Sequence, residues 1–260
     1  MLCVSAVFGA EKKETPAIYT KGGGLKPHKI VEYKKTDKPR PLNLHIFYPE
    51  NYKEGDKLPA IVMFFGGGWL GGNANQLYPQ SAYLASRGMI AICAQYRIRA
   101  YYKAQPFHCV EDGKSAMRYV RKHAAELGVD PDKLAAGGAS AGGHVAAATA
   151  TVKAWDCEKD DLSVSAIPNA LVLFNAVYDN GPGGYGNNER DSRVKDYWQK
   201  ISPLHNLDGN QPPTLVLVGD KDQHVRLEKI KEYEKTMKDN GDICKTVLYK
   251  DTGHGFFNLH

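Results

Sequence analysis

The sequence contains no block of five or six charges of one sign, and no apolar run as long as the roughly eighteen residues that a membrane-spanning helix needs. Lys and Arg number 34 against 29 Asp and Glu, so a net charge of +5 is spread along 260 residues. A dispersed charge of this size describes a solvated surface and argues against a nucleic-acid-binding protein. We therefore expect neither a nucleic-acid partner nor a membrane span.

Cysteines are also few, and none of them is paired in the sequence. The five, which are Cys3, Cys93, Cys109, Cys157 and Cys244, form no CxxC pair and show no metal-ligand spacing. An odd number of scattered cysteines argues against a disulfide framework but leaves room for one bridge. The sequence implies no metal.

The first ten residues, MLCVSAVFGA, are apolar and stop abruptly at EKKE. They resemble the end of a signal peptide, but they lack its positively charged start, and the cleavage pattern is imperfect. Two interpretations stay open: a truncated signal of a secreted or periplasmic protein, or an ordinary N-terminus of a cytoplasmic one. We take residues 1–24 as a tail and residues 25–260 as a single domain, since one core suits this length.

Short apolar segments indicate the fold class. KIVEYKKT and LNLHIFYP, separated by the turn-forming DKPRP, predict an antiparallel hairpin with one wet face. The later segments AIVMFF, MIAICAQY, KLAAGG, ALVLFNAV, TLVLVGD and CKTVLYK are mostly apolar, as in buried strands. Residues 111–128 and 224–241 carry apolar side chains at helical spacing and end in glycine. The alternation predicts an α/β fold, a mostly parallel sheet with helices on both faces.

One long stretch, residues 179–199, has no clear period. It reads DNGPGGYGNNERDSRVKDYWQ, and its Gly, Asn and Pro residues predict a loop. A loop of this length inside a compact domain is usually a functional surface or a lid.

The strongest chemical signal is a GxSxG motif centred on Ser140, between a predicted strand and an alanine-rich helix. The small residues on both sides of the serine, including Gly138 and Gly142, permit the tight strand-to-helix turn that lifts a hydroxyl above a sheet edge. The context of the motif favours a nucleophile elbow over a packing turn with an incidental serine.

A serine is a weak nucleophile unless a base takes its proton and an acid orients that base. His254 lies between two glycines after the last predicted strand, where a loop can bring an imidazole to the sheet edge. Asp222 follows the strand TLVLVGD, and we prefer it to Asp220, which is close enough to the strand to brace the turn. The order Ser140, Asp222, His254 is the order expected for an α/β-hydrolase.

With these residues in place, the sequence resembles α/β-hydrolases of the esterase and lipase group, similar to hormone-sensitive lipase and bacterial acetyl esterases. The resemblance covers about residues 59–257 and rests on FFGGGW, QYR, GGASAGG, ISPLHN, GDKDQHV and GHGF, which occur in the family's order. It implies Ser140 as the nucleophile, Asp222 as the orienting acid and His254 as the base.

The resemblance also places the oxyanion hole at the backbone N–H groups of Gly67, Gly68 and Ala141. The family's HGGG motif begins with histidine, whereas this chain has Phe65, so we expect apolar packing to brace the glycine loop. The larger relatives carry a substantial N-terminal cap, for which this chain has little room. We therefore expect a minimal cap and an open, shallow site, covered by the tail and by residues 179–199.

The leading hypothesis is a serine carboxylesterase that hydrolyses short-chain acyl esters through an acyl-enzyme, without a cofactor. Its substrate would be a small-molecule ester or an acetylated or feruloylated carbohydrate, because the aromatic faces of Trp69, Tyr185 and Trp198 could stack on sugars. Ordinary core or lid packing of these aromatics is the alternative. Two other functions stay open: an amidase or peptidase on the same scaffold, and a catalytically silent binding protein with a hydrolase fold.

Overall fold

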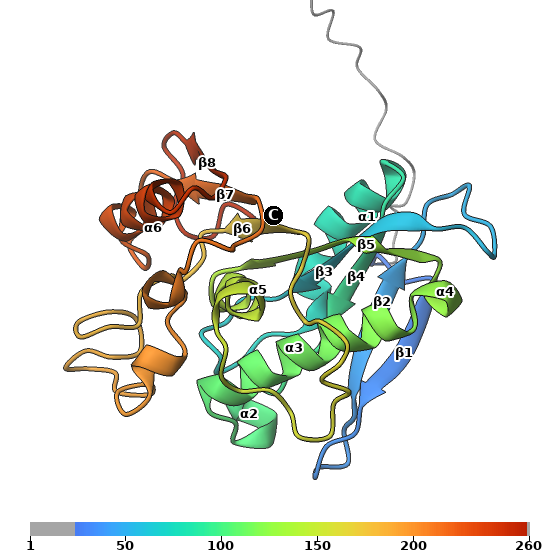
Figure 1. Ribbon diagram of the computed structural model, residues 1–260, viewed down its shortest axis with the longest axis horizontal. Helices are drawn as coiled ribbons and strands as arrows, with labels where there is room; N and C mark the ends of the chain where they lie inside the picture. Colours follow the sequence, from blue (N-terminus) through green and yellow to red (C-terminus); the bar gives the residue numbers. More distant parts are fainter. Residues whose placement is uncertain (1–23, 259–260) are drawn as a thin grey trace, which may run out of the picture.

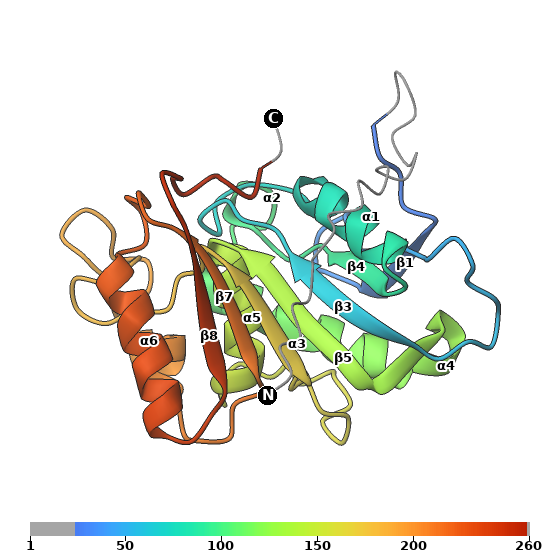
Figure 2. The same cartoon turned by 90° about the horizontal axis from the view of Figure 1, so that it is seen from above.

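The alternating strands and helices form an eight-stranded sheet in the computed structural model, which describes residues 24–258 (Figures 1 and 2). The strands lie in the order β1-β2-β4-β3-β5-β6-β7-β8. Their bounds are β1 Lys29–Lys34, β2 Leu42–Phe47, β3 Leu58–Phe64, β4 Ile90–Ala94, β5 Val129–Ala139, β6 Ala170–Phe174, β7 Thr214–Gly219 and β8 Cys244–Tyr249. Each predicted strand is present. The predictions for residues 1–10 lie outside the described residues.

The hairpin at the start of the sheet is confirmed as antiparallel, with Val31 opposite Leu44. Strand β2 also pairs antiparallel with β4, and every later pairing in the sheet is parallel. All residues of β4 and the last five of β3 are buried, because helices cover both faces of the sheet there. The carboxyl ends of β3, β5 and β7 meet at one edge, where this fold places its ligands.

Helices cover both faces, as predicted. Figure 1 shows α1 above the strands and α3 and α5 below them. The α-helices are α1 Tyr78–Ser86, α2 Arg99–Tyr102, α3 Pro106–Lys122, α4 Ala124–Leu127, α5 Ala141–Thr151 and α6 Leu227–Asp239, and the 3₁₀ turns are η1 Ala74–Leu77, η2 Trp198–Lys200 and η3 Pro203–Asn206. Within residues 24–258, no helix is long and apolar enough to cross a membrane.

One expected helix is divided in the structure, and the long loop is present as expected. The single helix expected over residues 111–128 is divided at His123 into α3 and α4, and Gly128 ends α4 with a left-handed φ of 72°. Residues 179–199 form a loop, as predicted, apart from one isolated bridge and the start of η2.

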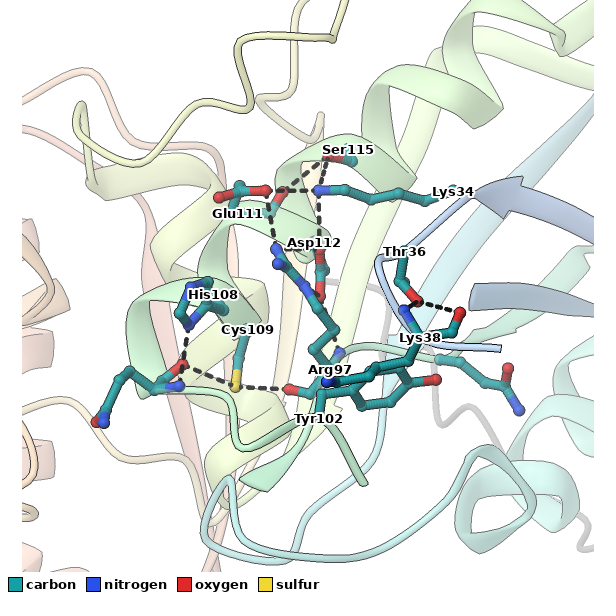
Figure 3. Close-up of polar contacts among 12 residues, drawn as sticks. Lys34, Thr36, Lys38, Arg97, Tyr102, His108, Cys109, Glu111, Asp112 and Ser115 are labelled. Atoms are coloured by element: carbon teal, nitrogen blue, oxygen red, sulfur yellow. Dashed lines mark hydrogen bonds and ion pairs between the residues drawn. The ribbon is translucent and has the colours of Figure 1, made fainter. Parts of the chain in front are cut away.

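A network of buried charges joins β1, the end of β4 and α3 (Figure 3). Arg97 binds both carboxylate oxygens of Asp112 at 2.8 Å, and Lys34 binds Asp112 and Glu111, also at 2.8 Å. The Asp112 side chain is fully buried. Because Arg97 follows Tyr96 directly, this network fixes the segment that leaves β4 beside the glycine loop.

Candidate active site

Ser140 occupies the sharp turn between β5 and α5. Its φ of 53° and ψ of −120° are a strained conformation for a residue with a side chain. The turn needs glycine on both sides of the serine: a Cβ on Gly142 would lie 2.1 Å from the Phe64 carbonyl oxygen, and one on Gly138 would lie 2.4 Å from the Gly142 oxygen. The local sequence therefore folds into the geometry that the GxSxG motif predicts.

The structure brings together the three residues that the sequence singled out. Ser140 Oγ lies 2.8 Å from His254 Nε2, and His254 Nδ1 lies 2.8 Å from Asp222 Oδ2. With the proton on Nδ1, the imidazole donates to Asp222 and accepts from the serine hydroxyl. This arrangement allows His254 to take the proton of Ser140 while Asp222 stabilises the imidazolium.

Asp222 is held as a carboxylate by its surroundings. Burial raises the pKa of this carboxyl, but the hydrogen bonds from His254 and from the backbone N–H groups of Val225 and His224 outweigh burial and leave the pKa below its usual value. Its Oδ1 accepts the His224 N–H at 2.8 Å and the Val225 N–H at 2.9 Å. The acid is therefore ionised and oriented at neutral pH.

Asn175, directly after β6, connects the loop that follows β7 to the loop that carries His254. Its side-chain NH₂ donates to the backbone oxygens of His254 and Gly253, and its Oδ1 accepts the N–H of Gly219 at 3.0 Å. The side chain is fully buried, and φ is 42°. Sequence reasoning missed this residue, because its partners lie far along the chain and no periodic pattern marks them.

The glycine loop follows β3 and faces the serine. Gly67 and Gly68 have φ values of 124° and 63°. Within residues 24–258, the N–H groups of Gly67 and Gly68 donate to no other backbone group, and Ala141, as the first residue of α5, has no acceptor within that helix. Gly67 and Gly68 line the same cleft as Ser140. The loop thus offers unpaired donors at the place where an oxyanion hole is expected.

Aromatic packing braces this loop at Phe65, the position at which the HGGG motif of the esterase and lipase group has a histidine. The ring of Phe65 stacks on Tyr96 at 4.2 Å between centroids and an angle of 16°. The Tyr96 hydroxyl also donates to the Phe65 carbonyl oxygen at 2.6 Å, and the Gly66 N–H donates to Gln76 Oε1 at 2.6 Å. Phe65 therefore braces the loop together with Tyr96, whose ring stacks on Phe65 and whose hydroxyl binds the Phe65 carbonyl oxygen.

A second brace comes from the long loop. Arg193 Nη1 donates to the carbonyl oxygen of Gly68, and its Nε donates to Asp191 at 2.7 Å. The guanidinium lies over the rings of Trp69 and Tyr185, at 5.2 Å and 5.6 Å from their centroids. No sequence signal pointed to Arg193, which lies 125 residues from Gly68 along the chain.

The cleft at Ser140 has a volume of about 240 Å³. Tyr185 lines it, as do His224 and Phe257. The other two predicted substrate contacts do not. Trp69 is 1% exposed and packs edge-on against His144 at 5.0 Å, while Trp198 lies in a separate apolar cluster. Of the three aromatics, the structure therefore brings only Tyr185 to the cleft, and the expectation of three stacking surfaces is corrected.

Among the residues that the structure describes, no group of three His, Cys, Asp or Glu side chains is arranged to hold a metal ion. In the same part of the chain, the four cysteines are free. His144 is fully buried beneath the elbow and contacts the Ile201 carbonyl oxygen at 3.0 Å through Nε2. It braces the helix rather than facing the cleft.

Comparison with known proteins finds two hydrolase family models and several esterase structures that are similar to this chain. A family model described as BD-FAE matches residues 44–181, and a model of the dienelactone hydrolase family matches residues 185–260. The propionate-bound structure of a thermophilic esterase from Thermogutta terrifontis is 39% identical, with a TM-score of 0.83 over 89% of this chain and 86% of that chain. The apo form of Thermogutta terrifontis esterase 2 is 40% identical, with a TM-score of 0.84 over the same shares.

Curated relatives are longer than this chain. Esterase LipQ of Mycobacterium tuberculosis is 27% identical over 258 residues, which cover 90% of this chain and 59% of LipQ. An AB hydrolase superfamily protein of Schizosaccharomyces pombe is 33% identical over 119 residues, 45% of this chain and 34% of its own. The BD-FAE match spans more than half of the sequence, and the esterase structures share the fold of this chain over 89% of its length. The chain therefore belongs to the BD-FAE family, within the carboxylic ester hydrolases of the α/β-hydrolase fold.

Proposed function

We propose that this protein is a serine carboxylesterase that hydrolyses short-chain acyl esters. The observation that carries the proposal is the hydrogen-bonded chain from Ser140 through His254 to Asp222, at 2.8 Å for each step. The chain is built on an elbow whose strained serine places its hydroxyl in the cleft. A strained nucleophile beside an oriented base is the arrangement that acyl transfer requires.

In the first step, Ser140 Oγ attacks the acyl carbonyl while its proton moves to His254 Nε2. The N–H groups of Gly67, Gly68 and Ala141 stabilise the negative oxygen of the tetrahedral intermediate. His254 then protonates the departing alcohol, leaving an acyl group on the serine. Water attacks this acyl-enzyme with His254 again as the base, and the carboxylic acid leaves.

We propose short acyl groups for this cleft, which has a volume of about 240 Å³ and is lined by Tyr185, His224 and Phe257. Related esterase structures were determined with propionate and with butyrate bound, which supports the same size range. A decorated carbohydrate stays a narrower proposal that rests on Tyr185 alone among the three aromatics. Release of acetate or ferulate from decorated xylan would support it, and hydrolysis of p-nitrophenyl acetate without such release would reject it.

The decisive experiment replaces the nucleophile. Ser140→Ala should lower kcat for p-nitrophenyl acetate by at least a thousandfold or so and abolish labelling by a fluorophosphonate probe. Ser86→Ala changes an exposed serine in the same way and should behave like the wild type in both assays. Near-wild-type hydrolysis by Ser140→Ala would show that the mechanism is wrong, and a wild-type protein that neither hydrolyses esters nor labels would favour the silent binding protein.

The amidase or peptidase alternative is tested on the same protein by comparing ester and amide substrates that share one acyl group. We expect kcat/KM to favour the ester strongly. A higher value for the amide would reassign the reaction while leaving the triad in place.

A further inference from the structure

The glycine loop adopts a conformation that needs support from its surroundings. Three consecutive residues, Gly67, Gly68 and Trp69, have left-handed φ values of 124°, 63° and 63°. A tryptophan in this region is strained, and such a backbone persists only when neighbouring groups determine it. The contacts that hold the loop therefore decide where its N–H groups point.

Two of these contacts come from the backbone of Arg99 and Ala100, thirty residues further along the chain. The Trp69 oxygen accepts the Arg99 N–H at 3.0 Å, and the Leu70 oxygen accepts the Ala100 N–H at 3.0 Å. The carbonyl of Gly68 is held differently, by the side chain of Arg193 from the 179–199 loop. Gly68 lies at the centre of the left-handed run and carries one of the proposed oxyanion donors.

Arg193 is itself fixed in place. Its Nε and Nη2 bind the two carboxylate oxygens of Asp191, and the Tyr197 hydroxyl donates to its backbone oxygen at 2.7 Å. Burial lowers the pKa of Arg193, but the hydrogen bond and the charge of Asp191 outweigh it and raise the pKa above its usual value. The planar guanidinium can bind Asp191 with one edge and still donate to Gly68 through Nη1.

We propose that Arg193 is a positioning residue for the oxyanion hole, and that the 179–199 loop completes this hole by holding the Gly68 carbonyl through Arg193. Fixing the C=O of Gly68 fixes the peptide plane between Gly68 and Trp69, which restricts the adjoining plane that carries the Gly68 N–H. Arg193 does not line the cleft, so it acts through Gly68 and not on the substrate. The inference rests on the proposed esterase function.

The test compares Arg193→Ala and Arg193→Lys with Arg190→Ala, a control three residues away in the same loop whose side chain is exposed. Each variant is assayed for kcat and KM with p-nitrophenyl acetate, and for affinity toward an alkyl trifluoromethyl ketone, which forms a tetrahedral adduct on the serine. Thermal unfolding and near-ultraviolet circular dichroism check that each variant is folded. Inhibition by the matching alkyl methyl ketone, which is neutral and forms little tetrahedral adduct, measures binding without an oxyanion.

We expect Arg193→Ala to lower kcat on the order of tenfold to a hundredfold with KM changed by less than about threefold, since a displaced donor is missed mainly in the transition state. Affinity for the trifluoromethyl ketone should fall in parallel, while inhibition by the methyl ketone stays constant. Arg193→Lys keeps the charge but cannot bind Asp191 and Gly68 together, so its kcat should be restored only in part. Arg190→Ala should match the wild type.

The proposal is overturned if Arg193→Ala keeps kcat within about twofold of Arg190→Ala, or if its loss lies in KM or equally in binding of the methyl ketone. A wild-type kcat for Arg193→Lys would also overturn it, because a single point charge would then suffice. Should Arg193→Ala fail to fold, Arg193→Lys carries the test, with an expected loss of at least about threefold in kcat at constant KM. Absence of hydrolysis by both the wild type and Arg190→Ala would instead reject the esterase function itself.

Discussion

At the scale of single residues, the two aspartates after β7 show how small differences in position decide a role. Asp222 is 1% exposed at its side chain and contacts His254, whereas the Asp220 side chain has a buried Oδ1 with no hydrogen-bond partner among the described residues. Both carboxylates follow the same strand within three residues, so the sequence favoured one over the other only by distance from the strand end.

Asp222→Asn should lower kcat by roughly a thousandfold or more, because an amide in this place holds the wrong imidazole tautomer and leaves the imidazolium without its counter-charge. KM should change little, since Asp222 does not line the cleft. Asp220→Asn is the matched control and should keep kcat within about threefold of the wild type. Equal losses in the two variants would mean that the acid has been assigned incorrectly.

Residues of the proposed triad could be predicted from the sequence because short motifs at strand ends carry their chemistry. Asn175, Tyr96 and Arg193 could not, since each acts through contacts with distant segments that leave no local pattern. Trp69 and Trp198 were misread for a related reason: an aromatic residue looks the same in a sequence whether it faces a cleft or a core. Burial separates Trp69 from Tyr185, and position relative to the cleft separates Trp198 from it; only the fold determines either property.

At the scale of elements, the network of Lys34, Arg97, Glu111 and Asp112 connects the outermost strand to α3 and to the end of β4 (Figure 3). Two cations share the fully buried Asp112, while the Glu111 side chain is 22% exposed. Water can reach Glu111 and replace part of its hydrogen bonding to the cations, but it cannot reach the fully buried Asp112.

Asp112→Asn should destabilise the protein by about 3 kcal/mol or more, because it leaves Arg97 and Lys34 buried beside a neutral amide. Glu111→Gln removes the neighbouring, half-buried carboxylate and should cost clearly less. Urea unfolding of both variants at neutral pH measures the difference in the free energy of unfolding. A loss for Asp112→Asn no larger than that for Glu111→Gln would contradict the role given to the buried pair.

Strands were predicted more completely than helices, for a physical reason. Buried parallel strands are continuously apolar, which leaves a strong signal in β3, β4 and β7. Helix α1 buries only small side chains, Ser81, Ala82 and Ala85, so it has little amphipathic contrast and no helix was predicted there. The division of α3 from α4 at His123 is a local change of backbone angle that the apolar spacing does not encode.

At the scale of the whole molecule, one buried histidine links acidity to stability. Burial lowers the pKa of His144 from 6.5 to about 4, so the folded protein keeps this imidazole neutral where the unfolded chain binds a proton. Between these two values the unfolded state holds more protons, and the contribution of His144 to stability rises with pH. It is fully present above pH 6.5 and is lost as the pH falls toward 4.

His144→Gln keeps a donor toward Ile201 but removes the titration. The free energy of unfolding of the wild type should fall by up to about 3 kcal/mol more than that of the variant between pH 6.5 and pH 4. Chemical unfolding of both proteins across this range measures the difference in slope. Parallel curves would mean that His144 is protonated as easily in the folded protein as in the unfolded chain.

The turn around Ser140 and the end of β3 touch through bare backbone, since a Cβ on Gly142 would lie 2.1 Å from the Phe64 oxygen. For directed evolution, this contact divides the catalytic surface into two kinds of position. Positions 138 and 142 leave no volume for diversity, and a library that randomises them would consist mostly of misfolded clones. New specificity is better sought at Tyr185 and its loop neighbours, where side chains already meet open space.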